Sequence, residues 1–110
     1  MDTVTTPGAV ADAAVEMLAE GWLGNLGPGP VPKLRSLDAT IRSRLRGDPR
    51  AELLLADVVA HPHSVSARRT LAEELSYYVE VDSEFAGAVS AILLDMSRSG
   101  IPPMAALRWL

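Results

Sequence analysis

The chain has 110 residues, 48% of them apolar, and a net charge of −4, which suits one soluble domain with a single modest core. It contains no cysteine, and this excludes a disulfide framework, a thiolate metal site and a thiol nucleophile. Aromatic residues make up only 5%, so the core must be built mainly from Ala, Leu and Val, a composition that favours helices over strands.

The first predicted helix covers residues 7–23 and follows a disordered N-terminus, residues 1–6. Thr6 is a suitable N-cap, and Pro7 suits the first helical position, where no backbone donor is needed. The apolar stripe of this helix is Val10, Ala14, Met17, Leu18 and Trp22. Residues 24–32 are rich in glycine and proline, and they predict a stiff connector without regular structure.

The second predicted helix covers residues 33–46, with its apolar side chains Leu34, Leu37, Ile41 and Leu45 inward. Gly47 ends it, and Asp48 with Pro49 begins the next helix as N-cap and first residue. In residues 51–60 of that helix, apolar side chains occupy nearly every side, which is typical of a buried helix. We therefore expect the other helices to pack around it, with Leu54, Leu55 and Val58 among the most buried residues.

Two further helices and a tail complete the predicted fold. Ser64 is expected to cap the fourth helix, and Asp82 or Ser83 the fifth. Their apolar stripes are Ala67, Leu71, Leu75, Tyr78 and Val79, and Phe85, Val89, Ile92, Leu93 and Met96. Residues 101–110 predict a short apolar tail helix. The sequence thus predicts one all-α domain over residues 7–110, a compact bundle of five to six short helices around a buried central helix.

Groups that could carry chemistry are few. His61 and His63 flank a proline, and Asp57 lies one helical turn before His61, so these three side chains could ligate zinc. This spacing is not a recurrent ligand pattern and no fourth ligand is evident, so a helix end followed by a turn is the simpler interpretation. The glycine-rich residues 24–30 lack the strand, lysine and hydroxyl residue of a phosphate-binding loop. We expect no cofactor, no metal and no catalytic activity.

Charge is strongly segregated along the chain. Residues 1–32 carry four acids and no base, residues 33–50 carry six bases against two acids, and the remainder carries eight acids against four bases. Opposed charged faces suit contact with a complementary protein surface. We expect the basic helix to meet another protein or a second copy of this chain, through Lys33, Arg35, Arg42 and Arg46.

Two other features bear on partners. Arg35, Arg42 and Arg46 are spaced by seven and four, so they could contact phosphates, although the acidic total disfavours nucleic acid. The tail carries apolar residues at helical spacing and an adjacent tryptophan, namely Met104, Leu107, Trp109 and Leu110. So short a helix must dock, either on its own bundle or in a groove of a partner. No stretch is long enough to span a membrane, the start of the chain lacks a secretory pattern, and we expect a cytoplasmic protein.

A resemblance covers residues 47–94. It is carried by Gly47-Asp48-Pro49, Leu53, Pro62, Ser64, Ala67, Leu71, Ala72, Leu75, Asp82, Phe85-Ala86 and Ile92. This series resembles small helical modules of actinobacterial signalling and conflict-system proteins, of the effector-associated or death-like kind. The resemblance implies recruitment of partners by helix-to-helix contact, beside a separate effector domain.

The sequence therefore predicts a non-catalytic protein–protein interaction or adaptor module of a signalling, defence or multi-subunit assembly. One alternative is a small nucleic-acid-associated regulator that uses the basic helix 33–46. Another is an accessory subunit of a larger enzyme complex, whose catalytic residues would belong to the partner.

Overall fold

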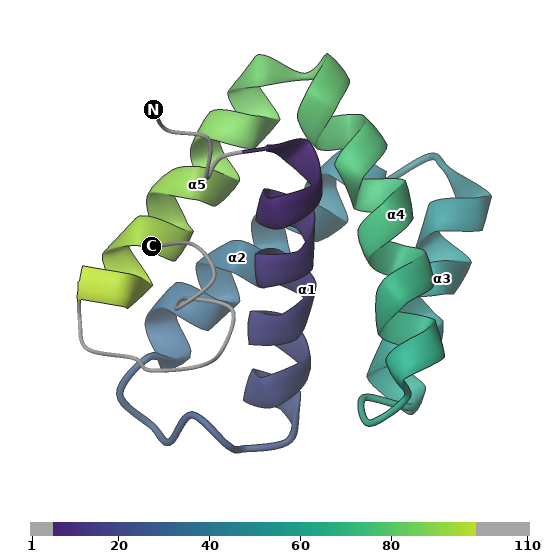
Figure 1. The fold of residues 1–110 in the computed structure, drawn as a ribbon. Coiled ribbons are helices and arrows are strands. Elements are labelled where there is room, and N and C mark those ends of the chain that lie inside the picture. Colours follow the sequence, from purple (N-terminus) through teal and green to yellow (C-terminus); the bar gives the residue numbers. More distant parts are fainter. Residues whose placement is uncertain (1–5, 99–110) are drawn as a thin grey trace.

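The computed structural model describes residues 6–98, and within this range the chain forms five α-helices and no strand (Figure 1). The helices are α1 (Pro7–Trp22), α2 (Val31–Leu45), α3 (Pro49–Ala60), α4 (Val65–Val81) and α5 (Ser83–Arg98). The predicted all-α bundle is confirmed. The predicted disordered N-terminus, apart from Thr6, and the predicted tail helix at residues 101–110 lie outside the described residues.

Side-chain caps begin four of the helices in the described range, at positions that the sequence predicts. The oxygen atoms of Thr6, Asp48 and Ser64 accept hydrogen bonds of 3.1 to 3.2 Å from the backbone N–H three residues further on. Asp82 accepts the equivalent bond from the N–H of Phe85 at 3.0 Å. Each cap satisfies a backbone donor that has no partner inside its helix, so the caps fix where these helices start.

The second helix begins earlier than the sequence predicts. Val31 and Pro32 form its first turn, although the glycine and proline content of residues 24–32 predicts that both belong to the connector. Proline is tolerated there because the first N–H groups of a helix have no acceptor within it. At the other end, Gly47 has a φ of +91°, a backbone conformation that glycine adopts without strain, and this confirms the predicted stop after α2.

The central helix of the bundle is α1. Its fully buried residues occupy most of its surface: Val10, Ala11, Ala13, Ala14, Val15, Met17, Leu18 and Ala19. It packs most extensively against α4 and also contacts α2, α3 and α5 (Figure 1). Four of the eight residues are alanines, whose small side chains let neighbouring helices approach closely.

The prediction that residues 51–60 form the central helix is therefore wrong. In α3 only one stripe is buried, formed by Ala51, Leu55 and Val58, and Leu54 is half-buried. Leu53 is 71% exposed and Val59 is 42% exposed. The helix packs mainly on α4 at the side of the bundle, so its outward apolar side chains are left on the surface. Apolar residues on every side of a helix allow it to be buried. Whether it is buried depends on how many other helices of the bundle pack around it.

Candidate protein interface

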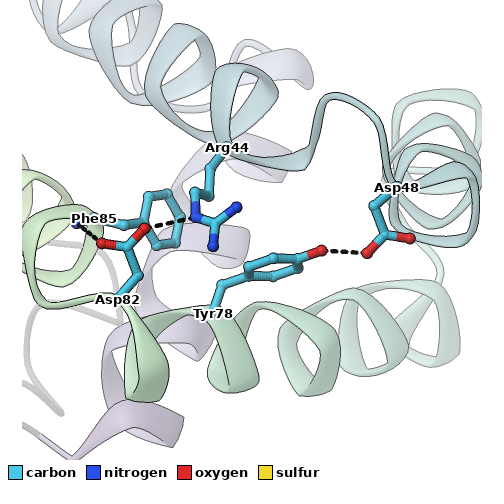
Figure 2. Close-up of polar contacts among 5 residues, drawn as sticks. All are labelled: Arg44, Asp48, Tyr78, Asp82 and Phe85. Atoms are coloured by element: carbon cyan, nitrogen blue, oxygen red, sulfur yellow. Dashed lines mark hydrogen bonds and ion pairs between the residues drawn. The ribbon is translucent and has the colours of Figure 1, made fainter.

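A polar junction joins the ends of four helices, and it holds the titratable groups with the clearest pKa shifts in the described range. Figure 2 shows its side chains, which come from the C-terminal end of α2, the N-cap of α3, the last turn of α4 and the N-cap of α5. The Tyr78 hydroxyl donates a hydrogen bond to Asp48. The Arg44 Nε donates to Asp82 Oδ2 at 2.7 Å, and the Arg44 guanidinium lies 4.5 Å from the centre of the Tyr78 ring.

Three pKa values are shifted in this junction. The hydrogen bond to Asp48, together with burial, raises the pKa of Tyr78 from 10.0 to about 12. The same hydrogen bond, helped by the N–H of Ala51, lowers the pKa of Asp48. The N–H of Phe85 and the Arg44 guanidinium lower the pKa of Asp82. All three shifts arise because the folded chain stabilises a neutral phenol and two charged carboxylates.

The contacts of this junction have a structural role, because they hold the ends of α2, α3, α4 and α5 together. Both carboxylates serve as helix N-caps, and Arg44 and Tyr78 tie these two caps together. Each titratable side chain of the junction is thus hydrogen-bonded to another residue of the fold. The predicted place of Tyr78 in the apolar stripe of α4 is confirmed, because its side chain is buried. The hydrogen bond from its hydroxyl to Asp48 joins residues 30 positions apart, which helical spacing does not predict.

The candidate metal ligands do not come together. His61 is the C-cap of α3, where its backbone N–H donates to the Asp57 carbonyl at 2.9 Å, and the side chains of Asp57, His61 and His63 are exposed. In the part of the chain that the structure describes, no group of three or more His, Asp or Glu side chains is arranged to hold a metal ion.

Three of the four predicted partner-binding bases lie along one edge of α2. Because each residue turns an α-helix by about 100°, Arg35, Arg42 and Arg46 fall within about 40° of one another when the helix is continued to its C-cap, Arg46. All three are exposed. Lys33 lies on the opposite side of the helix, where its ammonium group pairs with Asp95 Oδ2 of α5 at 2.9 Å. The structure thus brings the arginines together and separates the lysine from them.

A first hollow flanks the N-terminal half of this edge, between α2 and α1. It has a volume of about 170 Å³, and its lining is mostly apolar: Leu18, Gly21, Trp22, Val31, Leu34, Arg35 and Asp38. The absence of a side chain at Gly21 lets α1 approach α2, because a Cβ atom there would lie 2.7 Å from a methyl carbon of Leu34.

A second hollow flanks the C-terminal half of the same edge, between α2 and α3. Its volume is about 290 Å³, and it is lined by Arg42, Leu45, Arg46, Glu52, Leu55 and Ala56. The two hollows are adjacent, because Asp38 lines the first, Arg42 lines the second, and these two side chains form an ion pair of 2.9 Å. The arginine edge therefore runs beside two neighbouring hollows, the first lined mostly by apolar residues and the second by apolar and charged residues in equal number.

Exposed apolar side chains of α3 extend the second hollow. Val59 follows Leu55 by one helical turn and Glu52 by two, so it lies on the same side of α3 as the hollow. Leu53 precedes Ala56 by three residues and adjoins the hollow on the outer side. We name this whole surface the α2 edge. It consists of the two hollows and of Arg35, Arg42, Arg46, Leu53 and Val59.

The electrostatics of the α2 edge leave its charge available to a partner. Arg42 forms an ion pair with Asp38, but this i,i+4 pair is exposed and contributes little to stability. Arg35 and Arg46 form no ion pair within residues 6–98. Sequence spacing predicted the three arginines. It missed the apolar residues beside them, because Leu18, Trp22 and Leu55 come from other helices and reach this edge only through the tertiary fold.

The remaining predicted partner-binding residues, Met104, Leu107, Trp109 and Leu110, lie outside the described residues. Within residues 6–98, none of the helices has the length and apolar character needed to cross a lipid bilayer. In comparisons with known proteins, no protein-family model, no curated protein and no solved structure matches this chain.

Proposed function

We propose that this protein is a non-catalytic protein–protein interaction module whose α2 edge binds an acidic, partly apolar surface. The observation that carries the proposal is the position of exposed arginines beside two hollows that contain apolar side chains, along one side of α2. Apolar area supplies the driving force of protein association, and complementary charge supplies specificity and speed of encounter. Arginine and tryptophan are also the residues most often found at the energetic centre of such contacts.

Two further observations support an adaptor role. Leu53 is 71% exposed, and a large apolar side chain beside a hollow gains most when a partner covers it. The resemblance of residues 47–94 to effector-associated or death-like modules implies the same mode of action, by contact between helices. On this basis we propose an adaptor of a cytoplasmic signalling, defence or multi-subunit assembly; an accessory subunit of a larger enzyme complex would use the same surface.

Nucleic-acid binding is the alternative proposal. Its support is the single edge shared by Arg35, Arg42 and Arg46, which could follow a phosphate backbone. The carboxylates of Asp38 and Glu52 line the same two hollows, and they weaken the attraction for nucleic acid and for an acidic protein alike. The apolar side chains of the hollows give nucleic acid little to bind but can be covered by apolar side chains of a protein, so a partly apolar protein surface fits better.

Affinity capture with matched variants tests the proposal. The test variant is Arg35→Glu with Arg42→Glu, and the control is Arg69→Glu with Arg98→Glu, which changes the net charge equally at exposed positions away from the α2 edge. We expect a stoichiometric partner that the parent and the control retain and the test variant loses. Identical sets of bound proteins on the parent and the test variant would contradict the proposal, and nuclease-sensitive DNA or RNA in the eluate would favour the alternative.

A further inference from the structure

A second exposed surface lies on α4 and has the opposite charge. Glu73, Tyr77 and Glu80 follow one another by four and three residues, so they lie on one face of the helix, and Val81 adjoins them. Tyr77 is 59% exposed and Val81 is 57% exposed, and both glutamates are also exposed. Neither glutamate forms an ion pair within the described range. We name this surface the α4 face.

The α4 face has what the α2 edge requires in a partner. It combines two carboxylates that form no ion pair within residues 6–98 with two large exposed apolar side chains on one helix. From these observations we propose that the α4 face of one copy of this chain docks on the α2 edge of a second copy. The inference rests on the proposed function, in that it identifies the acidic surface that the α2 edge binds.

The spacing of the charges on the two surfaces matches. Arg35 and Arg42 are seven residues apart, as are Glu73 and Glu80, and at 1.5 Å per residue both pairs are about 10.5 Å apart along their helices. Tyr77 then falls between the two ion pairs, where α2 presents the small exposed side chain of Ala39. An aromatic side chain enclosed by charged pairs is a frequent centre of a protein interface.

Charge also selects the direction in which the helices dock. In a parallel arrangement, Arg46 lies beyond the last turn of α4, where the chain carries Asp82 and Glu84 and no base. In an antiparallel arrangement, Arg46 lies toward Arg69, one turn before Glu73 on α4, and like charges repel. The parallel arrangement is therefore favoured.

The contact must be between unlike surfaces. Two α2 edges would oppose arginine to arginine, and two α4 faces would oppose glutamate to glutamate. Much of α2 runs behind α1 in Figure 1 whereas α4 packs along another side of α1, so one copy has both surfaces available at once. A contact of this kind joins copies head to tail and forms a ring or an open chain instead of a closed two-fold dimer.

Sedimentation of neutralised variants tests this arrangement. The first variant removes the α2 edge by Arg35→Gln, Arg42→Gln and Arg46→Gln, and the second removes the α4 face by Glu73→Gln, Tyr77→Ser and Glu80→Gln. A control, Asp12→Asn, neutralises an exposed acid outside both surfaces. All the substituted side chains are exposed, so the helical circular dichroism of the variants should match that of the parent. Tyr77→Ser also removes the edge-to-face contact with the Tyr78 ring, so the second variant should unfold at a slightly lower temperature.

We expect the average mass of the parent and of the control to rise with concentration and to fall again with added salt. Each variant alone should associate at least tenfold more weakly. Mixed together, the two variants retain one intact surface each, so they should form a one-to-one complex of about twice the 11.7 kDa chain mass and nothing larger.

Three outcomes would overturn the inference: a parent that remains monomeric at the highest concentration reached, a mixture of the two variants that remains monomeric, or a second variant that associates as strongly as the parent. These results are distinct from a failure of the proposed function. If the chain is monomeric but loses a captured partner on Arg35→Glu with Arg42→Glu, the α2 edge binds another protein and only the self-contact is refuted.

Discussion

The position of α1 at the centre of the bundle makes a sharp prediction about two leucines. Leu18 of α1 is 2% exposed and Leu53 of α3 is 71% exposed. Replacing either with alanine removes the same three carbon atoms, so the chemistry of the two changes is equal. Any difference in the free energy of unfolding therefore reports how deeply each helix is embedded.

The expected magnitudes follow from burial. At about 0.8 kcal/mol per buried methylene, Leu18→Ala loses ~2.4 kcal/mol of transfer free energy. The cavity left behind adds to this loss, and the total cost is roughly 2 to 5 kcal/mol. Less than a third of Leu53 is buried, so Leu53→Ala loses at most ~0.7 kcal/mol. The higher helix propensity of alanine offsets part of that loss, leaving about 0.5 kcal/mol or less.

Urea denaturation followed by circular dichroism measures both values, and the slope of the transition checks that the unfolded state is unchanged. In thermal scans, Leu18→Ala should lower the Tm by about 10 °C or more, and Leu53→Ala by no more than a few degrees. If Leu53→Ala cost as much as Leu18→Ala, α3 and not α1 would be the embedded helix, and the assignment of Leu53 to an exposed interface would also fail.

Three further predictions concern α3, the junction and the histidines. Leu55→Ala should destabilise the fold by roughly 2 to 5 kcal/mol, because Leu55 is 4% exposed, and an unchanged urea midpoint would contradict that burial. In a Tyr77→Phe variant, the phenolate absorbance of Tyr78 should rise with a midpoint near the raised pKa of about 12, and a midpoint at the ordinary 10.0 would refute its bond to Asp48. Because this pKa is raised on folding, the stability that the bond contributes is complete below pH 10.0 and is lost as the pH rises through about 12, a loss that Tyr78→Phe should remove. Elemental analysis of untagged protein should find no stoichiometric zinc, whereas one zinc per chain that is lost on His61→Ala would establish a metal site.

Local features of this fold could be predicted from the sequence. Thr6, Asp48, Ser64 and Asp82 act through hydrogen bonds to backbone groups three residues away, so a short stretch of chain contains both partners. The alignment of Arg35, Arg42 and Arg46 likewise depends only on the helical repeat.

Features that depend on how helices meet could not be predicted in the same way. The alanines of α1 contribute little hydrophobicity each, yet their small size lets α1 lie in the centre, and the more apolar α3 is left at the side. Lys33 is close to Arg35 in sequence, but its partner Asp95 is 62 positions away. Arg44 is one of the six bases of residues 33–50, and only the fold places it over the Tyr78 ring.

The main packing partner of α1 is α4, which the ribosome synthesises well after α1. The last residue of α4 lies about 60 positions after the end of α1, and at ~5–20 residues per second a ribosome needs about 3 to 12 s to cover that distance. Throughout this interval, the apolar stripe of α1 has no α4 to cover it. A nascent chain that ends after α3 should therefore remain unfolded and bind chaperones that recognise exposed apolar segments, and it should be released once α4 has emerged.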